Sequence, residues 1–207
     1  MTTSPTLRRY LTDQTGAAAA EFALVSILFL SLMMGTIDMA RLMWELNSAK
    51  AATRAAVRLA VVSAPAAQTF VNYDATIAPL NLAPGDPVPS TEDGGPPTIT
   101  CTSTSCTTGA LNSTSFNAIV AVMQAYYGRI QPANVVVEYR PVGLGFAGNP
   151  YGPDVEPLVT VRLCNSNIDA DGACTPVEFA PGILQAFGVD PFDMPAVASS
   201  LSGEDLA

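Results

Sequence analysis

The chain has 207 residues, enough for one modest domain and a terminal segment. It is 49% hydrophobic but only 13% charged, against about 25% charged residues in an average soluble domain. Six of the nine basic residues lie in the first 58 positions, so the rest of the chain is strongly acidic and the net charge is −9. An acidic surface repels the phosphate backbone, which excludes nucleic acid as a partner.

The first predicted element is an apolar helix over residues 17–37, in which Glu21 is the only charged residue. At 1.5 Å per residue this stretch is about 31 Å long, the thickness of the hydrocarbon core of a membrane. It is longer than the apolar region of a secretory signal peptide, which has about 7–15 residues. We therefore predict a single transmembrane helix here.

The helical pattern continues beyond this stretch and predicts a stem that projects from the membrane. Residues 38–62 are rich in Ala, Leu, Met and Arg, which are good helix formers. Arg41 is spaced to pair with Asp38 and with Glu45. We expect the helix to end near Ser63, because Pro65 follows and disfavours helical backbone before it.

The four cysteines are predicted to form disulfides, and the alternative is that they are free and buried. The chain has no histidine and no C-x-x-C motif, so a zinc site of the usual kind is not expected. Three pairings of Cys101, Cys106, Cys164 and Cys174 are possible, and the sequence does not choose among them. Disulfides place the C-terminal side in an oxidising compartment. Counting Lys and Arg around the span gives the opposite orientation, and we follow the cysteines.

The remainder predicts an α+β ectodomain with a few antiparallel strands, because helices and strands are segregated rather than alternating. Residues 64–112 are rich in Pro, Gly and Thr and predict a long irregular loop. The domain proper is expected over residues 113–207. Its first predicted element is an amphipathic helix within the stretch 113–130, with Ser113 or Thr114 as the N-cap and Gly128 as the stop. Strands are predicted over 134–142 and 156–164, a short helix over 180–188, and an edge strand over 193–202.

A further pattern surrounds the lone glutamate, in the stretch DQTGAAAAEFALV. A basic leader ends at Gly16, four alanines follow, and Glu21 and Phe22 are the fifth and sixth residues counted from Ala17. This arrangement resembles the TadE-like minor pseudopilins of the Flp, or tight-adherence, pilus system. The resemblance covers about the first 62 residues. It implies that residues 1–16 are a leader removed by a prepilin peptidase, and that residues 17–63 are the transmembrane helix and stem.

The same resemblance implies a structural role in the assembly or priming of an adhesive pilus. The partners would be the prepilin peptidase, other pilin-like subunits and the pilus assembly machinery. The protein would cross the bacterial inner membrane once, with its C-terminal domain in the periplasm, and could enter the filament. Cleavage would create an amine at Ala17, and Glu21 would pair with that amine on a neighbouring subunit, as in pilin-like assemblies. A partly desolvated pair of this kind is stronger than an exposed one.

One alternative is an ordinary signal anchor that is never processed and carries a periplasmic binding module. In that case Glu21 would simply lie at the headgroup level. Such a module could be stabilised by calcium, because residues 167–178 approach the template of a calcium-binding loop. The ligands would be Asn167, Asp169, Asp171 and Glu178. Asn at the first position and Pro176 inside the loop depart from that template, and a polar turn tied by Cys164 and Cys174 is the favoured reading.

No enzyme motif is found, and we predict that the protein is not an enzyme and needs no cofactor. The absence of histidine from the sequence excludes a Ser-His-Asp triad and most metal hydrolases. Gly143, Gly145 and Gly148 match the spacing of a dinucleotide-binding loop, but no helix can start in the Pro-containing stretch that follows. A membrane-tethered enzyme is the least favoured hypothesis.

Overall fold

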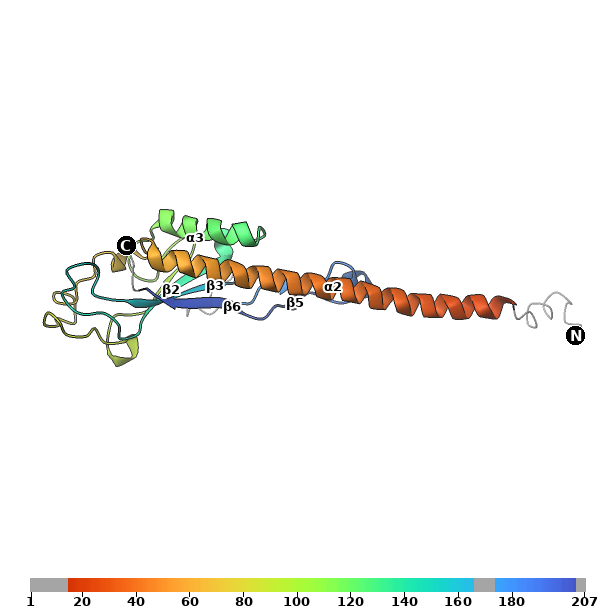
Figure 1. Ribbon diagram of the computed structural model, residues 1–207, viewed down its shortest axis with the longest axis horizontal. Coiled ribbons are helices and arrows are strands. Elements are labelled where there is room, and N and C mark those ends of the chain that lie inside the picture. Colours follow the sequence, from red (N-terminus) through yellow and green to blue (C-terminus); the bar gives the residue numbers. More distant parts are fainter. Residues whose placement is uncertain (1–14, 166–173, 204–207) are drawn as a thin grey trace, which may run out of the picture. The chain divides into compact units, whose positions relative to one another are not determined.

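The computed structural model describes residues 15–165 and 174–203 (Figure 1). The helix α2 runs without interruption over Thr15–Val62, 48 residues, and is followed by an α+β domain with an antiparallel sheet. This confirms the predicted fold class. The described chain divides into two compact units. The first contains residues 15–42 and Ala180–Pro191, and the second contains Met43–Phe179 and the C-terminal residues from Phe192.

A four-stranded antiparallel sheet forms the framework of the second unit. Its spatial order is β1-β2-β3-β6, with β1 at Ile99–Cys101, β2 at Val135–Pro141, β3 at Pro157–Leu163 and β6 at Val197–Ser202. The register places Val137 opposite Val161 and Tyr139 opposite Val159. Because side chains alternate along a strand, these residues share one buried face of the sheet. The predicted edge strand is confirmed as β6, which among the described strands pairs with β3 alone.

Two helices cover that face of the sheet (Figure 1). The part of α2 in the second unit buries a row of small residues, and α3, at Ser113–Tyr126, buries larger ones. Both rows have the spacing of one helical face. Alanines let α2 approach the sheet closely, while α3 fills the remaining space. The buried residues are Ala49, Ala52, Ala56, Val57 and Ala60 on α2, and Phe116, Ile119, Val120 and Met123 on α3.

The start of α3 differs from the prediction by one residue. Asn112 is the N-cap, and its side chain accepts a hydrogen bond of 3.3 Å from the N–H of Ser115. Asn, Ser and Thr are all good N-caps, so composition alone did not separate Asn112 from Ser113 or Thr114. The helix ends at Tyr126, two residues before Gly128.

The segment between the helices packs on the sheet through a buried tyrosine. The hydroxyl of Tyr139 accepts a hydrogen bond of 2.8 Å from the N–H of Ala66, just after α2. The rings of Tyr139 and Phe70 are 5.5 Å apart between centroids. Burial raises the pKa of Tyr139 to about 12, against a smaller lowering by the Ala66 hydrogen bond. Short 3₁₀ turns at Gln68–Phe70 and Thr91–Asp93, with strand β1, give this segment its regular structure.

Both pairs of nearby cysteines form disulfides, Cys101 with Cys106 and Cys164 with Cys174. The favoured reading of the cysteines is thus confirmed, and the pairing that the sequence left open is resolved. The connection between β2 and β3 contains Gly145, with φ at +100°. A Cβ there would lie 2.1 Å from the carbonyl oxygen of Asp154, so both the backbone and the space require glycine.

Four short elements complete the described chain. A 3₁₀ turn at Pro132–Asn134 precedes β2. Strands β4, Glu178–Phe179, and β5, Phe192–Asp193, pair as a separate two-stranded sheet of the second unit. The helix predicted over residues 180–188 is shorter than expected, a 3₁₀ turn at Leu184–Phe187 that Gly188 closes in the left-handed conformation. This turn belongs to the first unit.

Candidate functional site

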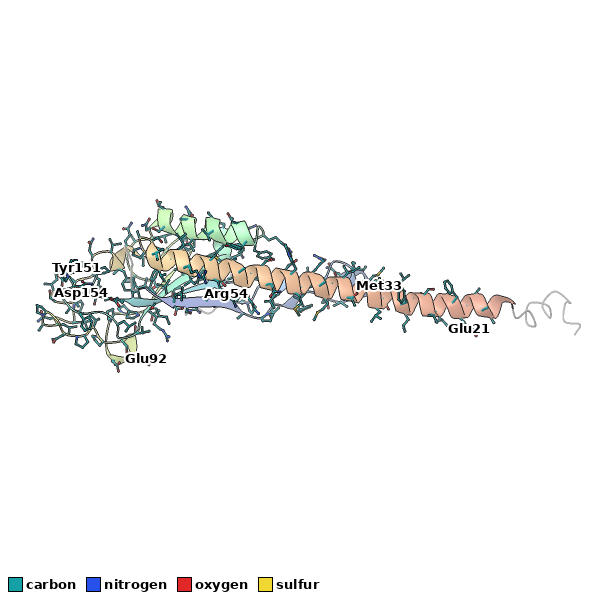
Figure 2. The ribbon with its side chains drawn as sticks, in the orientation of Figure 1. Glu21, Met33, Arg54, Glu92, Tyr151 and Asp154 are labelled. Atoms are coloured by element: carbon teal, nitrogen blue, oxygen red, sulfur yellow. A yellow bond between two sulfur atoms is a disulfide. The ribbon has the colours of Figure 1, made fainter. Side chains whose placement is uncertain are left out.

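The N-terminal part of α2 carries apolar side chains all around its circumference, and its large ones project into open space (Figure 2). Phe22 is 75% exposed and Leu28 is 72% exposed. A helix that is apolar on every side is stable when it is surrounded by protein or lipid. The chain covers none of its most apolar stretch, and among the described residues this is the one helix long and apolar enough to cross a membrane.

Two hydroxyl side chains in this stretch, those of Ser31 and Thr36, are satisfied within the helix. The hydroxyl of Ser31 donates a hydrogen bond of 2.8 Å to the carbonyl of Leu28, and the hydroxyl of Thr36 donates one of 2.7 Å to the carbonyl of Met33. A hydrocarbon core offers no water to a free hydroxyl, so such internal bonds are what a spanning helix needs.

The predicted processing and assembly residues all lie on the first two turns of α2. Gly16, Ala17, Glu21 and Phe22 are exposed. Within the part of the chain that the structure describes, the Glu21 carboxylate has no hydrogen bond or ion pair. A Cβ placed on Gly16 would meet nothing within 4 Å, so the fold of this chain does not itself require glycine there. The described structure therefore leaves these four residues accessible to other molecules.

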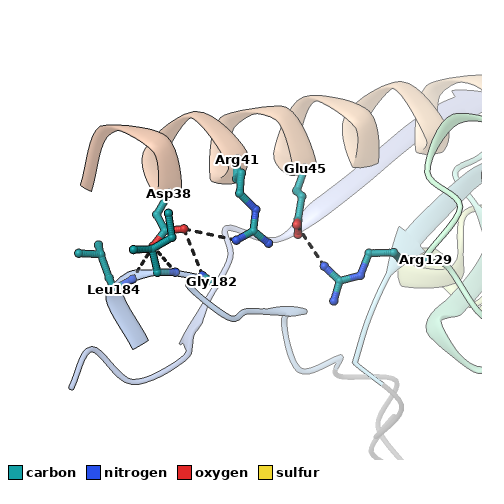
Figure 3. A network of polar contacts seen from close by, with 7 residues as sticks. Asp38, Arg41, Glu45, Arg129, Gly182 and Leu184 are labelled. Carbon is teal, nitrogen blue, oxygen red and sulfur yellow. Dashed lines mark hydrogen bonds and ion pairs between the residues drawn. The ribbon is translucent and has the colours of Figure 1, made fainter. Parts of the chain in front are cut away.

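Where the apolar stretch ends, Asp38 holds the Ala180–Pro191 segment against α2 (Figure 3). Its carboxylate accepts hydrogen bonds from three successive backbone N–H groups, those of Gly182 at 3.1 Å, Ile183 at 3.0 Å and Leu184 at 2.7 Å. Arg41 lies 3.3 Å from the same carboxylate, which confirms the predicted ion pair. Asp38 is only 2% exposed, and a buried carboxylate is stable only with partners of this kind. We call this arrangement the Asp38 latch.

The local sequence explains how the latch can form. A Cβ on Gly182 would lie 2.1 Å from Nη1 of Arg41, so a side chain there would push the Arg41 guanidinium away from its place beside Asp38. Gly188 then ends the 3₁₀ turn in the left-handed conformation. Sequence reasoning identified Asp38 and Arg41 as a pair but missed their role in binding residues 182–184. The one signal in the sequence was the Pro-Gly dipeptide before Ile183, which marks a turn but names no partner.

A second buried carboxylate on α2, Glu45, belongs to the second unit. It accepts a hydrogen bond from the hydroxyl of Tyr127 at 3.2 Å. It accepts another from Nη1 of Arg129 at 3.1 Å (Figure 3). Burial, and next the charge of Glu45, raise the pKa of Tyr127. These contacts fix the end of α3 to the helix stem. Sequence spacing related Glu45 to Arg41 and gave no indication of Tyr127 or Arg129.

The calcium hypothesis falls mostly outside the described residues. Asn167, Asp169 and Asp171 lie in the range 166–173, and only Glu178 is described. Glu178 is exposed on β4, directly opposite Asp193 of β5. Among the described residues no group of three or more His, Cys, Asp or Glu could hold a metal ion. The hypothesis stays a prediction.

Asp154 is buried, and backbone groups occupy its carboxylate. It accepts hydrogen bonds from the N–H groups of Ala75 at 2.5 Å, Gly148 at 2.9 Å and Asn149 at 2.8 Å. Such a carboxylate is an acceptor that shapes loops, and three of its roughly four lone-pair sites are already used. Its contacts assign it a structural role, joining residue 75 to the β2–β3 connection.

Comparison with known proteins gives one match. A family model described as TadE-like protein matches residues 16–58. The matched range starts at the proposed cleavage position and covers Glu21, the apolar stretch and Asp38. No curated protein and no solved structure matches the chain.

Proposed function

We propose, from the premise that residues 16–58 belong to the TadE-like family, that this protein is a pseudopilin that helps to assemble or prime a Flp-type adhesive pilus. Membership of this family implies a role in the biogenesis of that pilus. Residues 17–37 anchor the chain in the bacterial inner membrane, and the domain with the two disulfides lies in the periplasm. The role is structural, without a catalytic step.

One observation carries this proposal: the family match covers the part of the chain that the domain leaves uncovered. The large apolar side chains of α2 that the domain does not pack against, from Phe22 to Ile37, lie within residues 16–58. An exposed apolar helix of this length is stable when it inserts into lipid or packs against other helices. The disulfides support the periplasmic side, because reducing compartments keep such thiols unpaired.

Glu21 gives this helix a specific electrostatic feature. Prepilin peptidase would cut between Gly16 and Ala17, and the new amine would lie one helical turn from a carboxylate. On one chain the two groups face outward at similar depth. Between two chains they can form an ion pair in a medium of low dielectric constant, where the attraction is strong. Glu21 would then fix the register of neighbouring subunits and would not act as an acid or base.

The first experiment reads the N-terminus of the mature protein. The full chain is expressed in a host that has its prepilin peptidase, extracted from membranes and examined by mass spectrometry of the N-terminal peptide. We expect a chain that starts at Ala17. A chain that keeps Arg8 and Arg9 would contradict processing and would favour the unprocessed signal anchor.

Two glycine variants make the test specific. Both Gly16 and Gly35 lie in α2, and a Cβ on either meets nothing within 4 Å. Neither Gly16→Leu nor Gly35→Leu should therefore disturb the fold. Gly16→Leu should keep its leader, whereas Gly35→Leu should be processed normally. Equal processing of the two variants would count against a cut that depends on Gly16.

A further inference from the structure

The Ala180–Pro191 segment exposes apolar side chains in a stretch without charge. Residues 180–189 contain no Asp, Glu, Lys or Arg, although Glu178 and Asp190 flank them in an acidic part of the chain. Phe187 is 63% exposed and Val189 is 39% exposed. A short exposed loop with an aromatic residue and no charge is unfavourable in water and suited to an apolar surface.

The Asp38 latch sets the level of this segment along α2. Asp38 is the first charged residue after the apolar stretch, one residue beyond Ile37. Its hydrogen bonds to Gly182, Ile183 and Leu184 hold the segment at that turn of the helix. If residues 17–37 cross a membrane, this turn is where hydrocarbon gives way to headgroups.

The latch itself is suited to this boundary. A free carboxylate at the edge of hydrocarbon is costly, but that of Asp38 is balanced by three N–H groups and Arg41. The backbone of the segment is also partly satisfied, because the N–H of Gly188 bonds to the carbonyl of Gln185 at 3.1 Å and that of Val189 to Leu184 at 3.2 Å. Segments that lie at this level of a membrane bury Phe, Trp and Leu side chains at the boundary between headgroups and acyl chains.

We propose that residues 183–189 are a second membrane contact, and that the Asp38 latch seats Phe187 in the headgroup region of the leaflet that α2 leaves. The inference rests on the proposed membrane anchoring and goes beyond the role in pilus assembly. The occupant of this surface is lipid because the segment is held at the end of the spanning stretch, so the two apolar surfaces are continuous. Apolar contact drives the insertion, since the flanking acids gain nothing from anionic headgroups.

The test places single tryptophans in the full chain and measures quenching by brominated lipids. Trp44 is the only tryptophan and is 64% exposed, so Trp44→Phe gives a clean background. Phe187→Trp reports on the proposed contact. The protein is reconstituted in phosphatidylethanolamine and phosphatidylglycerol vesicles, with bromine either near the headgroup or near the chain end. Both leaflets carry the label, so the orientation of insertion does not matter.

Two further variants separate this inference from the proposed anchoring. Phe29→Trp lies in the middle of the apolar stretch, and Tyr151→Trp replaces a residue of the second unit that is 97% exposed. We expect deep bromine to quench Phe29→Trp, shallow bromine to quench Phe187→Trp with a blue shift, and neither to quench Tyr151→Trp. Adding Asp38→Ala to Phe187→Trp should abolish the shallow quenching.

Each other outcome has a definite meaning. If Phe187→Trp alone were not quenched, the membrane contact would be overturned and the anchoring by α2 would stand. If Phe29→Trp were not quenched, the membrane contact and the anchoring would both be overturned. A blue shift at Phe187→Trp without quenching, growing with the ratio of protein to lipid, would mean that another copy of the chain covers the loop, and this too would overturn the proposal. Quenching that survives Asp38→Ala would overturn the role of the latch.

Discussion

Asp38 and Leu184 are 146 positions apart in the sequence, yet the N–H of Leu184 donates a hydrogen bond of 2.7 Å to the Asp38 carboxylate. The contact joins α2, at the end of its apolar stretch, to a segment near the other end of the chain. A carboxylate that binds successive backbone N–H groups acts as a cap and is stronger than a neutral acceptor. Together with the bonds from Gly182 and Ile183, this contact holds the Ala180–Pro191 segment on α2.

Removing the carboxylate should release the segment. In Asp38→Ala the N–H groups of Gly182, Ile183 and Leu184 lose their acceptor, so local opening becomes easier. We expect hydrogen exchange at these three amides to rise by roughly tenfold or more, since bonds to charged groups are the stronger ones. Hydrogen exchange with mass spectrometry on the detergent-solubilised full chain measures this.

Asp190→Ala is the matched control, because Asp190 is an exposed acid in the same segment. Its exchange should equal that of the unchanged chain. Amides in β3 should keep their protection in both variants. If Asp38→Ala left the exchange at residues 182–184 unchanged, the latch would not be what holds the segment.

The contacts of Glu45 with Tyr127 and Arg129, the Glu45 network, predict which of two variants loses more stability. Tyr127→Phe keeps the ring in place but removes the hydroxyl that donates to the buried Glu45 carboxylate, which costs about 1–3 kcal/mol. Arg129→Ala also takes a donor from Glu45, but Arg129 is 68% exposed, so water can replace the lost guanidinium and the cost should be less than about 1 kcal/mol. Thermal unfolding of the detergent-solubilised chain should show the larger fall in Tm for Tyr127→Phe, by about 2–4 °C per kcal/mol.

The neighbouring residue supplies the control. Tyr126 is 55% exposed, and Tyr126→Phe makes the same chemical change outside the network. Its Tm should stay that of the unchanged chain. A Tm of Tyr127→Phe equal to that of Tyr126→Phe would show that the hydroxyl contributes nothing to stability.

The spacing of apolar residues predicted most of the fold, because most of its helices and strands show helical or alternating hydrophobic periodicity. The buried residues of α3 follow helical spacing, and Val159, Val161 and Leu163 of β3 alternate as a strand with one buried face requires. In the Ala180–Gly188 stretch only a 3₁₀ turn forms, where a short helix was expected. Hydrogen bonds to the distant Asp38, rather than the helix propensity of these residues, hold that turn. Tertiary contacts of this kind leave no mark in the local sequence.

In the candidate site, too, some residues could be identified from the sequence and others could not. Glu21 and Gly16 could be singled out because an unusual residue in an apolar stretch is visible in the sequence. Tyr127 and Gly182 could not, because each matters through a partner far away in the chain. Spacing rules reach three or four residues along a helix, which is enough for Asp38 and Arg41 and no further.

Tyr139 should make the fold sensitive to alkaline pH. Its pKa is raised to about 12 by burial, above the ordinary value of 10.0, so the folded chain holds this proton more tightly than the unfolded one. The stabilisation is complete below pH 10 and is lost as the pH rises through about 12, by about 1.4 kcal/mol per pH unit at most. Denaturant unfolding at several pH values measures this.

Tyr139→Phe isolates this contribution. At neutral pH the variant should be less stable by about 1–3 kcal/mol, because the N–H of Ala66 loses its acceptor. Above pH 10 the gap to the unchanged chain should narrow, since phenylalanine has no proton to lose. A gap that is constant from neutral pH to about 12 would contradict a raised pKa at Tyr139.

The proposed role of Glu21 predicts a defect in assembly without a defect in insertion. Glu21→Ala replaces an exposed acid by a good helix former, so the helix and its insertion into the membrane should persist. Glu21→Gln keeps the shape and removes only the charge. Both variants leave a neighbouring amine without its counter-ion, and we expect surface filaments, counted by electron microscopy, to fall by roughly tenfold or more.

The control is Glu92→Ala, because Glu92 is an exposed acid in the Thr91–Asp93 turn, and this variant should assemble normally. Normal piliation in Glu21→Gln but not in Glu21→Ala would mean that a hydrogen bond, rather than an ion pair, positions the subunits. Normal piliation in both variants would remove Glu21 from the assembly mechanism.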